Sequence, residues 1–373
     1  MTRHLRDLLD AFDPSLPLER AQTIPSEWYF DADLADLERR TVFAGWQAVG
    51  RVDQLAGPGA YLTAEVAGEP VAVVRDEAGT LRAFHNVCRH RAAPVLCDPC
   101  GTVTKLRCRY HGWTYDLAGR LRGAPEFEGV ADFRREDFGL IPMIADTWGP
   151  TVWVHPESAA LRLADFLHPL PERTDSFSIG QLKWHARRTY DLACNWKVYV
   201  DNFLDGGYHV NTVHPGLAGV LDYGHYRTEV FSNTSVQISP LKPAAKDAVE
   251  GVVRLGDTAN YWWVFPNFMV NLYAGVMDTN LVLPLGPDRC RVVFDFYFAD
   301  GTPSDFITQS VAVAEQVQQE DVGICEDVQR GLRSRSFSTG RFSVRRENGG
   351  YHFHQLLART LRAGMPTETP ARA

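Results

Sequence analysis

Two histidines and an aspartate lie close together in one short stretch of this 373-residue chain, DNFLDGGYHVNTVH. Asp205, His209 and His214 fall within ten positions, although the whole chain has only 12 histidines. Two imidazoles beside a carboxylate are typical ligands of a divalent transition metal. The stretch therefore predicts a metal site.

The spacing of these side chains also predicts a distorted helix. If residues 192–210 are helical, Asn202 and Asp205 share a face with His209, because they precede it by seven and four positions. His214 would then lie about 140° further round an ideal helix than His209. Both imidazoles reach one metal only if the helix ends or bulges between them. Three nearby residues permit such a distortion: Gly206, Gly207 and Pro215.

A carboxylate that completes the site is predicted in QSVAVAEQVQQEDVGICEDVQRGL, within a helix expected over residues 308–332. Asp321 falls on the apolar stripe of this helix, where an unpaired buried carboxylate is costly. Metal coordination relieves that cost, and so does an ion pair with a buried arginine. Neighbouring Glu320 falls on the polar face and is the weaker candidate. The apolar residues of the stripe are Val313, Val317, Ile324, Cys325, Val328 and Leu332.

Together, His209, His214 and Asp321 would form a facial triad of two histidines and one carboxylate. Such a triad leaves coordination positions open for dioxygen, and iron(II) is the metal that it favours.

A second group of ligand-type residues lies earlier in the chain. Cys88-Arg-His90 is followed, after 17 residues, by Cys108-Arg-Tyr-His111 and then by Gly-Trp. A C-x-H and a C-x-x-H between short strands suit a 2Fe–2S cluster with two thiolates on one iron and two imidazoles on the other. Such a cluster transfers single electrons.

A structural zinc site is the competing interpretation of these cysteines. CDPC supplies Cys97 and Cys100, which with Cys88 and Cys108 would make a four-thiolate site. That arrangement leaves the two histidines, at their matched offsets, without a role.

Composition narrows the class of protein that surrounds these residues. The chain is 45% apolar and has a net charge of -8, which is typical of a globular protein and argues against nucleic-acid binding. Neither a secretory signal nor an apolar stretch approaching about 18 residues is found, so we expect no membrane span and a cytoplasmic location. The seven cysteines are then expected to be reduced.

The elements that must position these residues change along the chain. Residues 1–45 are helical in pattern, 46–156 consist of short β-like runs punctuated by Gly and Pro, and 157–373 alternate helices with long strands. We find no nucleotide-binding glycine motif. The pattern predicts an α+β chain with a small all-β domain.

Both groups of residues resemble those of a known family. CRHR…CRYHGW resembles the Rieske motif of the Rieske non-haem iron oxygenases (ring-hydroxylating oxygenase alpha subunits). NWKVYVDNFLDGGYH resembles their iron-binding helix, and QEDVGICEDVQRGL resembles the segment with the third iron ligand. The resemblance runs from about residue 46 to about residue 357. It is strongest for the choline monooxygenase-like branch, through MDTNLVLPLGPDRCRVVFDFYF and GYHFHQLLARTL.

The resemblance implies three parts and two cofactors. Residues 1–45 would pack on the catalytic domain, 46–156 would form the Rieske domain, and 157–373 a helix-grip-like catalytic domain with an antiparallel sheet. Cys88, His90, Cys108 and His111 would hold the 2Fe–2S cluster, while His209, His214 and Asp321 would hold mononuclear iron.

The resemblance also implies an electron path between subunits. Asp205 would link His209 to His111 of the partner subunit, in a homotrimer, and Asn202 would lie close to the iron. A separate reductase or ferredoxin would supply electrons from NAD(P)H. With O2, the enzyme would hydroxylate or N-demethylate a small quaternary ammonium compound such as choline, a betaine or carnitine.

A quaternary ammonium ion has no N–H to donate, so its recognition depends on aromatic faces. The segment YWWVFPNFMVNLY is dense in aromatic residues. The same residues suit the core of a sheet, or a pocket for the flat substrate of an aromatic-ring hydroxylase or demethylase. Our candidates for the substrate pocket are Trp262, Trp263, Phe265 and Tyr273.

Two classes without oxygenase activity compete with this interpretation. A Rieske-type electron carrier needs only the first group of ligands, and a zinc-stabilised binding module would be colourless. Iron content and colour distinguish them from an oxygenase.

Overall fold

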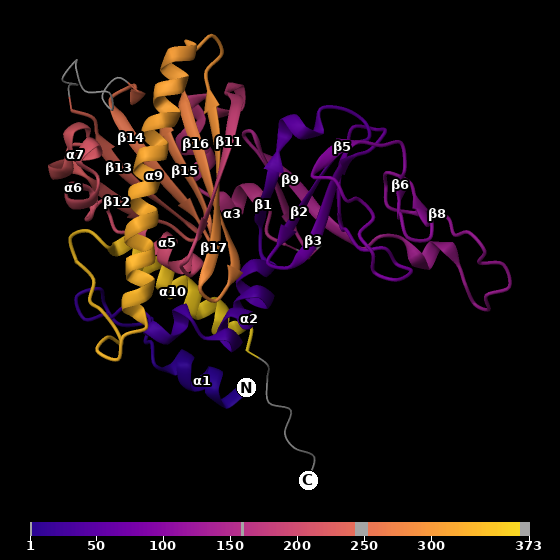
Figure 1. Ribbon diagram of the computed structural model, residues 1–373, viewed down its shortest axis with the longest axis horizontal. Coiled ribbons are helices and arrows are strands. Elements are labelled where there is room, and N and C mark those ends of the chain that lie inside the picture. Colours follow the sequence, from indigo (N-terminus) through magenta and orange to yellow (C-terminus); the bar gives the residue numbers. More distant parts are fainter. Residues whose placement is uncertain (1, 158–159, 243–252, 366–373) are drawn as a thin grey trace. The chain divides into compact units, whose positions relative to one another are not determined.

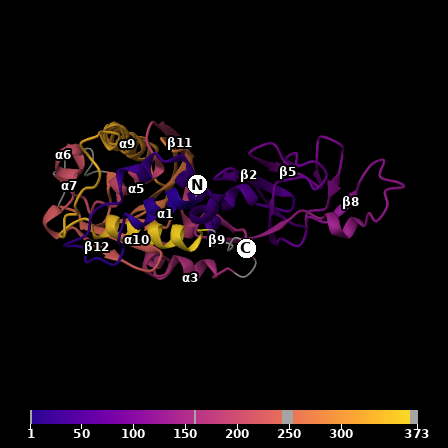
Figure 2. The same ribbon diagram turned by 90° about the horizontal axis from the view of Figure 1, so that it is seen from below.

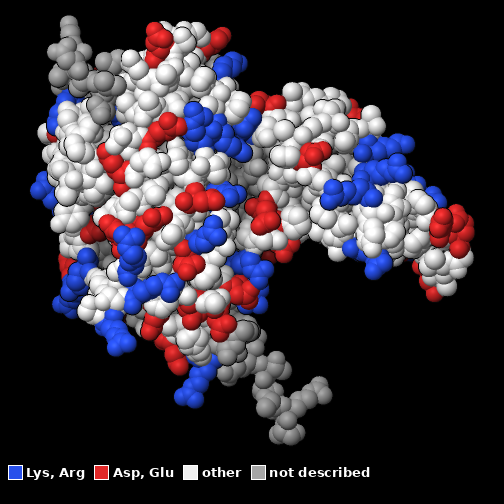
Figure 3. Space-filling view, in the orientation of Figure 1, with Lys and Arg blue, Asp and Glu red and all other residues white. Residues whose placement is uncertain are grey.

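The computed structural model describes residues 2–157, 160–242 and 253–365 (Figure 1). The chain packs as two compact units. The β unit is Phe43–Phe166, and the α+β unit combines Met1–Val42 with Leu167–Ala373. Within the described residues, no helix is long and apolar enough to cross a membrane. On the face drawn in Figure 3, acidic and basic side chains are interspersed over much of the surface.

The β unit is built on a seven-stranded antiparallel sheet with the order β1-β10-β9-β4-β3-β2-β5 and a small three-stranded sheet, β6-β7-β8. Short turns connect most strands, as their glycine and proline punctuation predicts. The strands are β1 (Gln47–Arg51), β2 (Ala60–Val66), β3 (Glu69–Arg75), β4 (Leu81–His85), β5 (Cys100–Thr102), β6 (Leu106–Arg107), β7 (Thr114–Tyr115), β8 (Leu121–Gly123), β9 (Pro142–Trp148) and β10 (Thr151–His155). Short helical turns follow at Val52–Leu55, Arg135–Phe138 and α3 (Leu163–Leu167).

One of the hydrophobic clusters of the β unit includes side chains from both of its sheets. Cys88, Cys108, Trp113 and Tyr115 are all buried in one hydrophobic cluster. The two Cys-His segments are therefore anchored to a packed core at their cysteines.

The α+β unit is organised by a second seven-stranded antiparallel sheet, in the order β11-β17-β16-β15-β14-β13-β12. The long helix α9 (Ser304–Leu332) lies across one face of it, which is a helix-grip arrangement (Figures 1 and 2). The strands are β11 (Lys183–Leu192), β12 (Arg227–Val230), β13 (Thr234–Pro240), β14 (Thr258–Val264), β15 (Phe268–Tyr273), β16 (Val276–Gly286) and β17 (Arg289–Phe298). The helices are α1 (Thr2–Asp10), α2 (Ala32–Thr41), α4 (Leu170–Thr174), α5 (Trp196–Phe203), α6 (Val210–Val213), α7 (Pro215–Val220), α9 and α10 (Asn348–Ala363).

A buried ion pair joins the N-terminal helix α2 to α5. Lys197 Nζ lies 2.6 Å from Glu38 Oε1, and the two side chains are 0% and 2% exposed. The second oxygen of Glu38 accepts a hydrogen bond from the indole of Trp196 at 2.9 Å. Removing one partner of such a pair would leave the other charge buried and unpaired, so the contact fixes α5, which precedes His209 and His214 in the chain.

The unit boundaries differ from those expected from the sequence. The β unit extends to Phe166, whereas the sequence pattern places the boundary at 156. The extra residues include most of α3, which the strand pattern could not anticipate. The expected third division, at residue 45, lies close to the start of the β unit at Phe43.

Candidate active site

The first Cys-His segment, residues 88–93, forms a tight turn closed by two backbone hydrogen bonds. Cys88 N–H donates to the carbonyl of Ala93 at 2.9 Å, and Ala92 N–H donates to the carbonyl of Cys88 at 3.0 Å. Ala92 has the left-handed φ of 59° that the turn requires. This backbone geometry places the half-buried His90 two residues after the buried Cys88.

The second segment, residues 108–113, repeats that turn. Cys108 N–H donates to the carbonyl of Trp113 at 2.9 Å, and Gly112 N–H donates to the carbonyl of Cys108 at 3.1 Å. Gly112 has a φ of 74°, which glycine adopts without strain. Two turns of the same hydrogen-bond pattern therefore present a C-x-H and a C-x-x-H side by side.

The imidazoles of the two turns lie together. The ring centroids of His90 and His111 are 4.6 Å apart, and His90 stacks on Trp113 with an interplanar angle of 6°. His90 Nδ1 is buried and has no hydrogen-bond partner among the residues that the structure describes. Burial and neighbouring His111 lower the pKa of His90, so the ring is held neutral, as a metal ligand must be.

The thiols also suit an iron–sulfur cluster. Cys88 Sγ lies 3.3 Å from the hydroxyl of Tyr115, and burial raises the pKa of the Cys108 thiol. A coordinated cation reverses that effect, because a ligating thiol is deprotonated. A buried nitrogen without a partner and two buried thiols, on paired turns, fit a 2Fe–2S group.

The four-thiolate alternative receives no support from the structure. Cys97 and Cys100 are exposed, whereas Cys88 and Cys108 are buried. In the described part of the chain, the four sulfurs do not come together as a group of metal-ligand atoms.

The segment before His209 and His214, the two predicted iron ligands, is not a continuous helix. α5 ends at Phe203, and both Gly206 and Gly207 have positive φ, at 69° and 72°. A Cβ at Gly206 would lie 2.0 Å from the carbonyl oxygen of Arg346, so only glycine fits there. The expected helix over 192–210 is therefore wrong, because the chain leaves the helix before Asp205.

The distortion predicted between the two histidines is nevertheless present. His209 immediately precedes α6, and His214 lies between α6 and α7, with φ -118° and ψ 79°. Pro215 begins α7, where proline is favoured. These short helices turn both imidazoles toward the same point.

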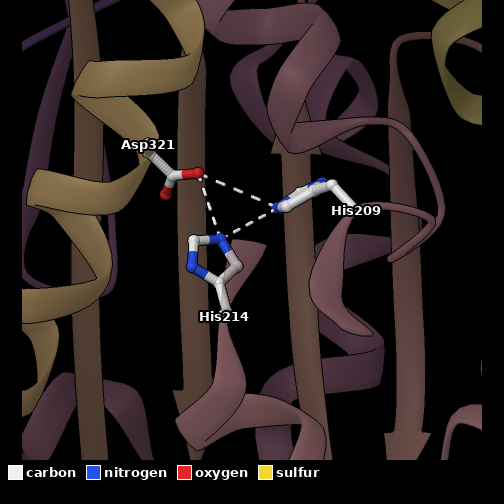
Figure 4. Close-up of side chains that lie close together, drawn as sticks. All are labelled: His209, His214 and Asp321. Atoms are coloured by element: carbon white, nitrogen blue, oxygen red, sulfur yellow. Dashed lines mark hydrogen bonds and ion pairs between the residues drawn. The ribbon is translucent and has the colours of Figure 1, made fainter. Parts of the chain in front are cut away.

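The structure brings His209, His214 and Asp321 together, with one ligand atom of each within 4.8 Å of the others (Figure 4). His209 Nε2 and His214 Nε2 are 3.0 Å apart, and Asp321 Oδ1 is 3.2 Å from the latter and 3.8 Å from the former. Two nitrogens about 2.1 Å from one metal, and at right angles, are also about 3.0 Å apart. The residues fit a facial iron site.

Each of the three side chains has a further partner that orients it. His209 Nδ1 is 2.5 Å from Asp205 Oδ2, and the Asn202 amide donates to Asp321 Oδ1 at 2.7 Å. Outer partners of this kind fix the tautomer and orientation of metal ligands. Asn202 and Asp205 are thus both in contact with the triad.

The partner of His214 was not anticipated from the sequence. Its Nδ1 lies 2.6 Å from Glu320 Oε2, and Gln316 donates to the other oxygen of Glu320 at 2.9 Å. Burial lowers the pKa of His214, but the hydrogen bonds and charges of Asp321 and Glu320 outweigh it and raise that pKa. In the sequence, the available signal for this contact was that Glu320 is adjacent to Asp321. In the structure, both residues lie on the side of α9 that faces the histidines.

The buried face of α9 differs in part from the predicted stripe. Val313, Cys325 and Leu332 are buried as expected, but Val328 is 44% exposed. Gln318 and Gln329 are buried instead, because they bond the Tyr199 hydroxyl and the backbone N–H of Asn195.

A pocket opens onto the triad between α9 and the sheet. His209, His214 and Asp321 form part of its wall. Its aromatic lining residues are Tyr199, Phe203, Tyr226, Tyr261, Tyr273, Phe294 and Phe296.

Of the four predicted pocket residues, only Tyr273 lines this pocket. Trp262 points to the other face of the sheet, where it stacks on Phe231 with the ring centroids 6.2 Å apart. Trp263 packs against Phe353 of α10, and Phe265 lies beyond the end of β14. The prediction of Trp262, Trp263 and Phe265 is wrong for this pocket. Alternation along β14 turns Tyr261 toward the pocket and Trp262 away from it. Trp263 is on the same side of the strand as Tyr261, but its ring packs against α10 and does not line the pocket.

The pocket wall has a further carboxylate, Asp278, besides those of Asp205 and Asp321. Asp278 on β16 is 8% exposed and accepts hydrogen bonds from Asn271 at 2.7 Å and Asn280 at 3.0 Å. Burial raises its pKa to about 6, while the two amides and the charge of Arg254 oppose that shift. The carboxylate is therefore mostly ionised at neutral pH, in a pocket otherwise rich in aromatic rings.

The chain matches two family models, the Rieske [2Fe-2S] domain over residues 45–134 and the ring hydroxylating alpha subunit (catalytic domain) over 179–363. It is 40% identical to the chloroplastic choline monooxygenase of Arabidopsis thaliana, over 95% of this chain and 86% of that protein. It is 30% identical to the carnitine monooxygenase oxygenase subunit of Escherichia coli K12, over 92% of this chain and 95% of that protein.

A solved structure of a quaternary ammonium Rieske monooxygenase, described for carnitine oxidation and inter-subunit electron transfer, superposes with a TM-score of 0.83. The two chains are 27% identical, over 95% of this chain and 98% of that one.

The protein belongs to the Rieske non-haem iron oxygenases, in the family of ring-hydroxylating alpha subunits. It is an oxidoreductase with a Rieske 2Fe–2S domain and a catalytic domain that binds mononuclear iron. The fold and cofactors that the sequence motifs predict are confirmed at the level of the family.

Proposed function

We propose that the protein is the oxygenase component of a multicomponent monooxygenase that hydroxylates or N-demethylates a small quaternary ammonium compound. The choline and carnitine monooxygenases to which it is similar support this substrate class. The observation in the structure that carries the proposal is the buried carboxylate of Asp278, in the pocket that opens onto the iron triad.

The pocket offers what a quaternary ammonium ion needs. Such an ion cannot donate a hydrogen bond, so it is bound by aromatic faces and by negative charge. The rings of Tyr226 and Tyr261 are stacked with their centroids 6.4 Å apart, and Tyr273 meets Tyr261 edge to face at 6.1 Å. A neutral flat ring would gain from these faces but not from the charge of Asp278.

We propose Cys88, His90, Cys108 and His111 as the cluster ligands, and His209, His214 and Asp321 as the iron ligands. When bound, the cluster supplies single electrons and the mononuclear iron activates dioxygen.

Other side chains of the protein orient the proposed ligands and surround the substrate. Asp205, Glu320 and Asn202 fix the three proposed iron ligands in orientation. The aromatic side chains exclude water from around the substrate, which strengthens the attraction of Asp278 for a cation.

We propose that Asp205 also connects the site with the cluster of another copy of the chain, as in a homotrimer. Charge complementarity supports this pairing. A second hollow, on the other side of Asp205, is lined by the carboxylates of Asp201 and Glu347. The cluster turns carry exposed basic residues of the opposite sign, Arg91, Arg107 and Arg109.

A separate reductase or ferredoxin is the proposed source of electrons, drawn from NAD(P)H. All seven cysteines are free thiols, as a reducing compartment would leave them, and we propose the cytoplasm as the location.

The proposal is tested by turnover with a surrogate reductase and NADH. Choline, glycine betaine and carnitine would each be supplied, with flat aromatic acids as the contrasting set. We expect substrate-dependent oxygen uptake that matches the formation of formaldehyde or an aldehyde from one of the ammonium compounds. Turnover of an aromatic acid, with no ammonium compound oxidised, would instead establish a ring hydroxylase or demethylase.

A further inference from the structure

Arg254 introduces a positive charge into the pocket that is proposed to bind a cation. Its side chain lines the same pocket as Asp278 and the iron triad. Its Nε donates to the hydroxyl of Tyr273 at 3.2 Å, and its guanidinium carbon lies 5.8 Å from the centre of that ring. The charge is thus held at the pocket wall by an uncharged partner.

The guanidinium has unused hydrogen-bonding capacity. Arg254 Nη1 is buried and has no hydrogen-bond partner in the part of the chain that the structure describes. An unpaired buried donor is costly, and the cost is greater when the group is charged. A ligand group that accepts from this nitrogen would remove the cost.

Asp278 does not supply that acceptor. Its carboxylate accepts hydrogen bonds from the amides of Asn271 and Asn280, and it forms no ion pair with Arg254 among the described residues. Among the described residues, one pocket therefore presents an anion and a cation that no direct hydrogen bond or ion pair joins. The ligand that matches both is a zwitterion.

We propose that the substrate is a betaine, a quaternary ammonium compound with a carboxylate, and that Arg254 binds this carboxylate. The inference rests on the proposed function and narrows its substrate class. The ammonium group lies among the tyrosines with Asp278, and the carboxylate accepts a hydrogen bond from Arg254 Nη1. Choline has no carboxylate and leaves Arg254 Nη1 unpaired.

The test is binding by titration calorimetry to the purified holoenzyme. Glycine betaine, β-alanine betaine and γ-butyrobetaine span three separations between carboxylate and ammonium, and choline carries the ammonium group alone. We expect at least one betaine to bind about 10-fold or more tightly than choline, because it satisfies a charged hydrogen bond that choline leaves open.

Substitution of the arginine gives the sharper comparison. Arg254→Met removes the guanidinium and retains a long apolar stem, and we expect it to weaken the preferred betaine about 10- to 100-fold. Choline binding should be unchanged or slightly tighter, which also shows that the pocket is folded. Arg291→Met is the matched control, because Arg291 pairs with Asp191 in a surface ion pair.

Three outcomes overturn the inference. Choline could bind the wild type as tightly as every betaine, Arg254→Met could weaken choline and betaine equally, or Arg291→Met could reproduce the effect. In these cases choline binding still supports the proposed function. If neither choline nor any betaine binds the wild type, the proposed function fails with it.

Discussion

The two proposed metal-binding regions hold their ligands by different means. In the cluster turns, ligands lie within six-residue segments that backbone hydrogen bonds close in the same way, at Cys88 and at Cys108. In the iron site, His214 and Asp321 are 107 positions apart, and side chains orient them. A local backbone motif therefore builds one site, and tertiary packing of α9 on the sheet builds the other.

The difference has a consequence for function. His111, a proposed cluster ligand, is exposed, whereas His214, a proposed iron ligand, is 2% exposed. An electron-transfer group must come close to its partner, while a site that binds dioxygen and substrate must exclude water.

The largest expected effect is the loss of iron from one proposed site while the other site keeps its iron. Cys108→Ala should remove the cluster, leaving about one iron per chain and no visible colour, because a thiolate ligand is lost. His214→Ala should instead leave about two irons with the colour intact. Iron and sulfide analysis of both variants, beside the wild type with about three irons, checks this. Loss of all iron from either variant would show that the sites are not independent.

A second variant tests the proposed link between the sites. Asp205→Asn keeps the shape of the side chain but changes its hydrogen bond to His209 Nδ1, so product formation should fall about 10- to 100-fold. Iron content and cluster absorption should not change. Asp222→Asn is the control, because Asp222 makes the same kind of contact with His225 at the surface. Unchanged turnover in Asp205→Asn would contradict the linking role.

The partner of His214 should affect iron affinity more modestly. Glu320→Gln weakens the charged hydrogen bond to His214 Nδ1. We therefore expect a chelator to remove the iron at a chelator concentration about 10-fold lower than the wild type requires. Glu315→Gln is matched to it on the same helix, because Glu315 pairs with Arg188 at the surface. Equal iron retention in the two variants would mean that Glu320 does not orient His214.

A further expected effect concerns stability and its dependence on pH. Burial raises the pKa of Asp278 from 3.8 to about 6, so the folded protein binds this proton more tightly than the unfolded chain. The resulting destabilisation is absent below about pH 4, grows through pH 6 and reaches about 3 kcal/mol at neutral pH. Asp278→Asn should therefore unfold at a higher temperature at pH 8, with little difference at pH 4.

Asp278 is surrounded by groups that bear on this prediction. Arg254, Asn271 and Asn280 favour its ionised form, and the hydroxyls of Tyr190 and Tyr199 stay neutral because burial raises both pKa values. The same variant should bind quaternary ammonium ions more weakly. Greater stability with unchanged binding would remove the functional reason for keeping this buried charge.

The same contrast explains how much could be predicted from sequence. The cluster segments are recognisable because ligand spacing and turn geometry are both local, as at Gly112. The triad was predictable from residue type, but the end of α5 before Asp205 depends on the close approach of Arg346 to Gly206. Glu320 and the pocket residues depend on which face of a helix or strand is turned inward. The register of β14 turns Trp262 away from the pocket, and the spacing of residues in the sequence does not tell which face of the strand is turned inward.

The most direct test of the account is whether a quaternary ammonium compound binds beside the iron. The ferrous protein would be treated with nitric oxide, and the electron paramagnetic resonance signal of its mononuclear iron recorded before and after the compound is added. We predict a changed signal in the wild type, at the concentration that saturates calorimetric binding, and a higher required concentration in Asp278→Asn. An unchanged signal at saturation would place the ammonium site away from the iron and contradict the account.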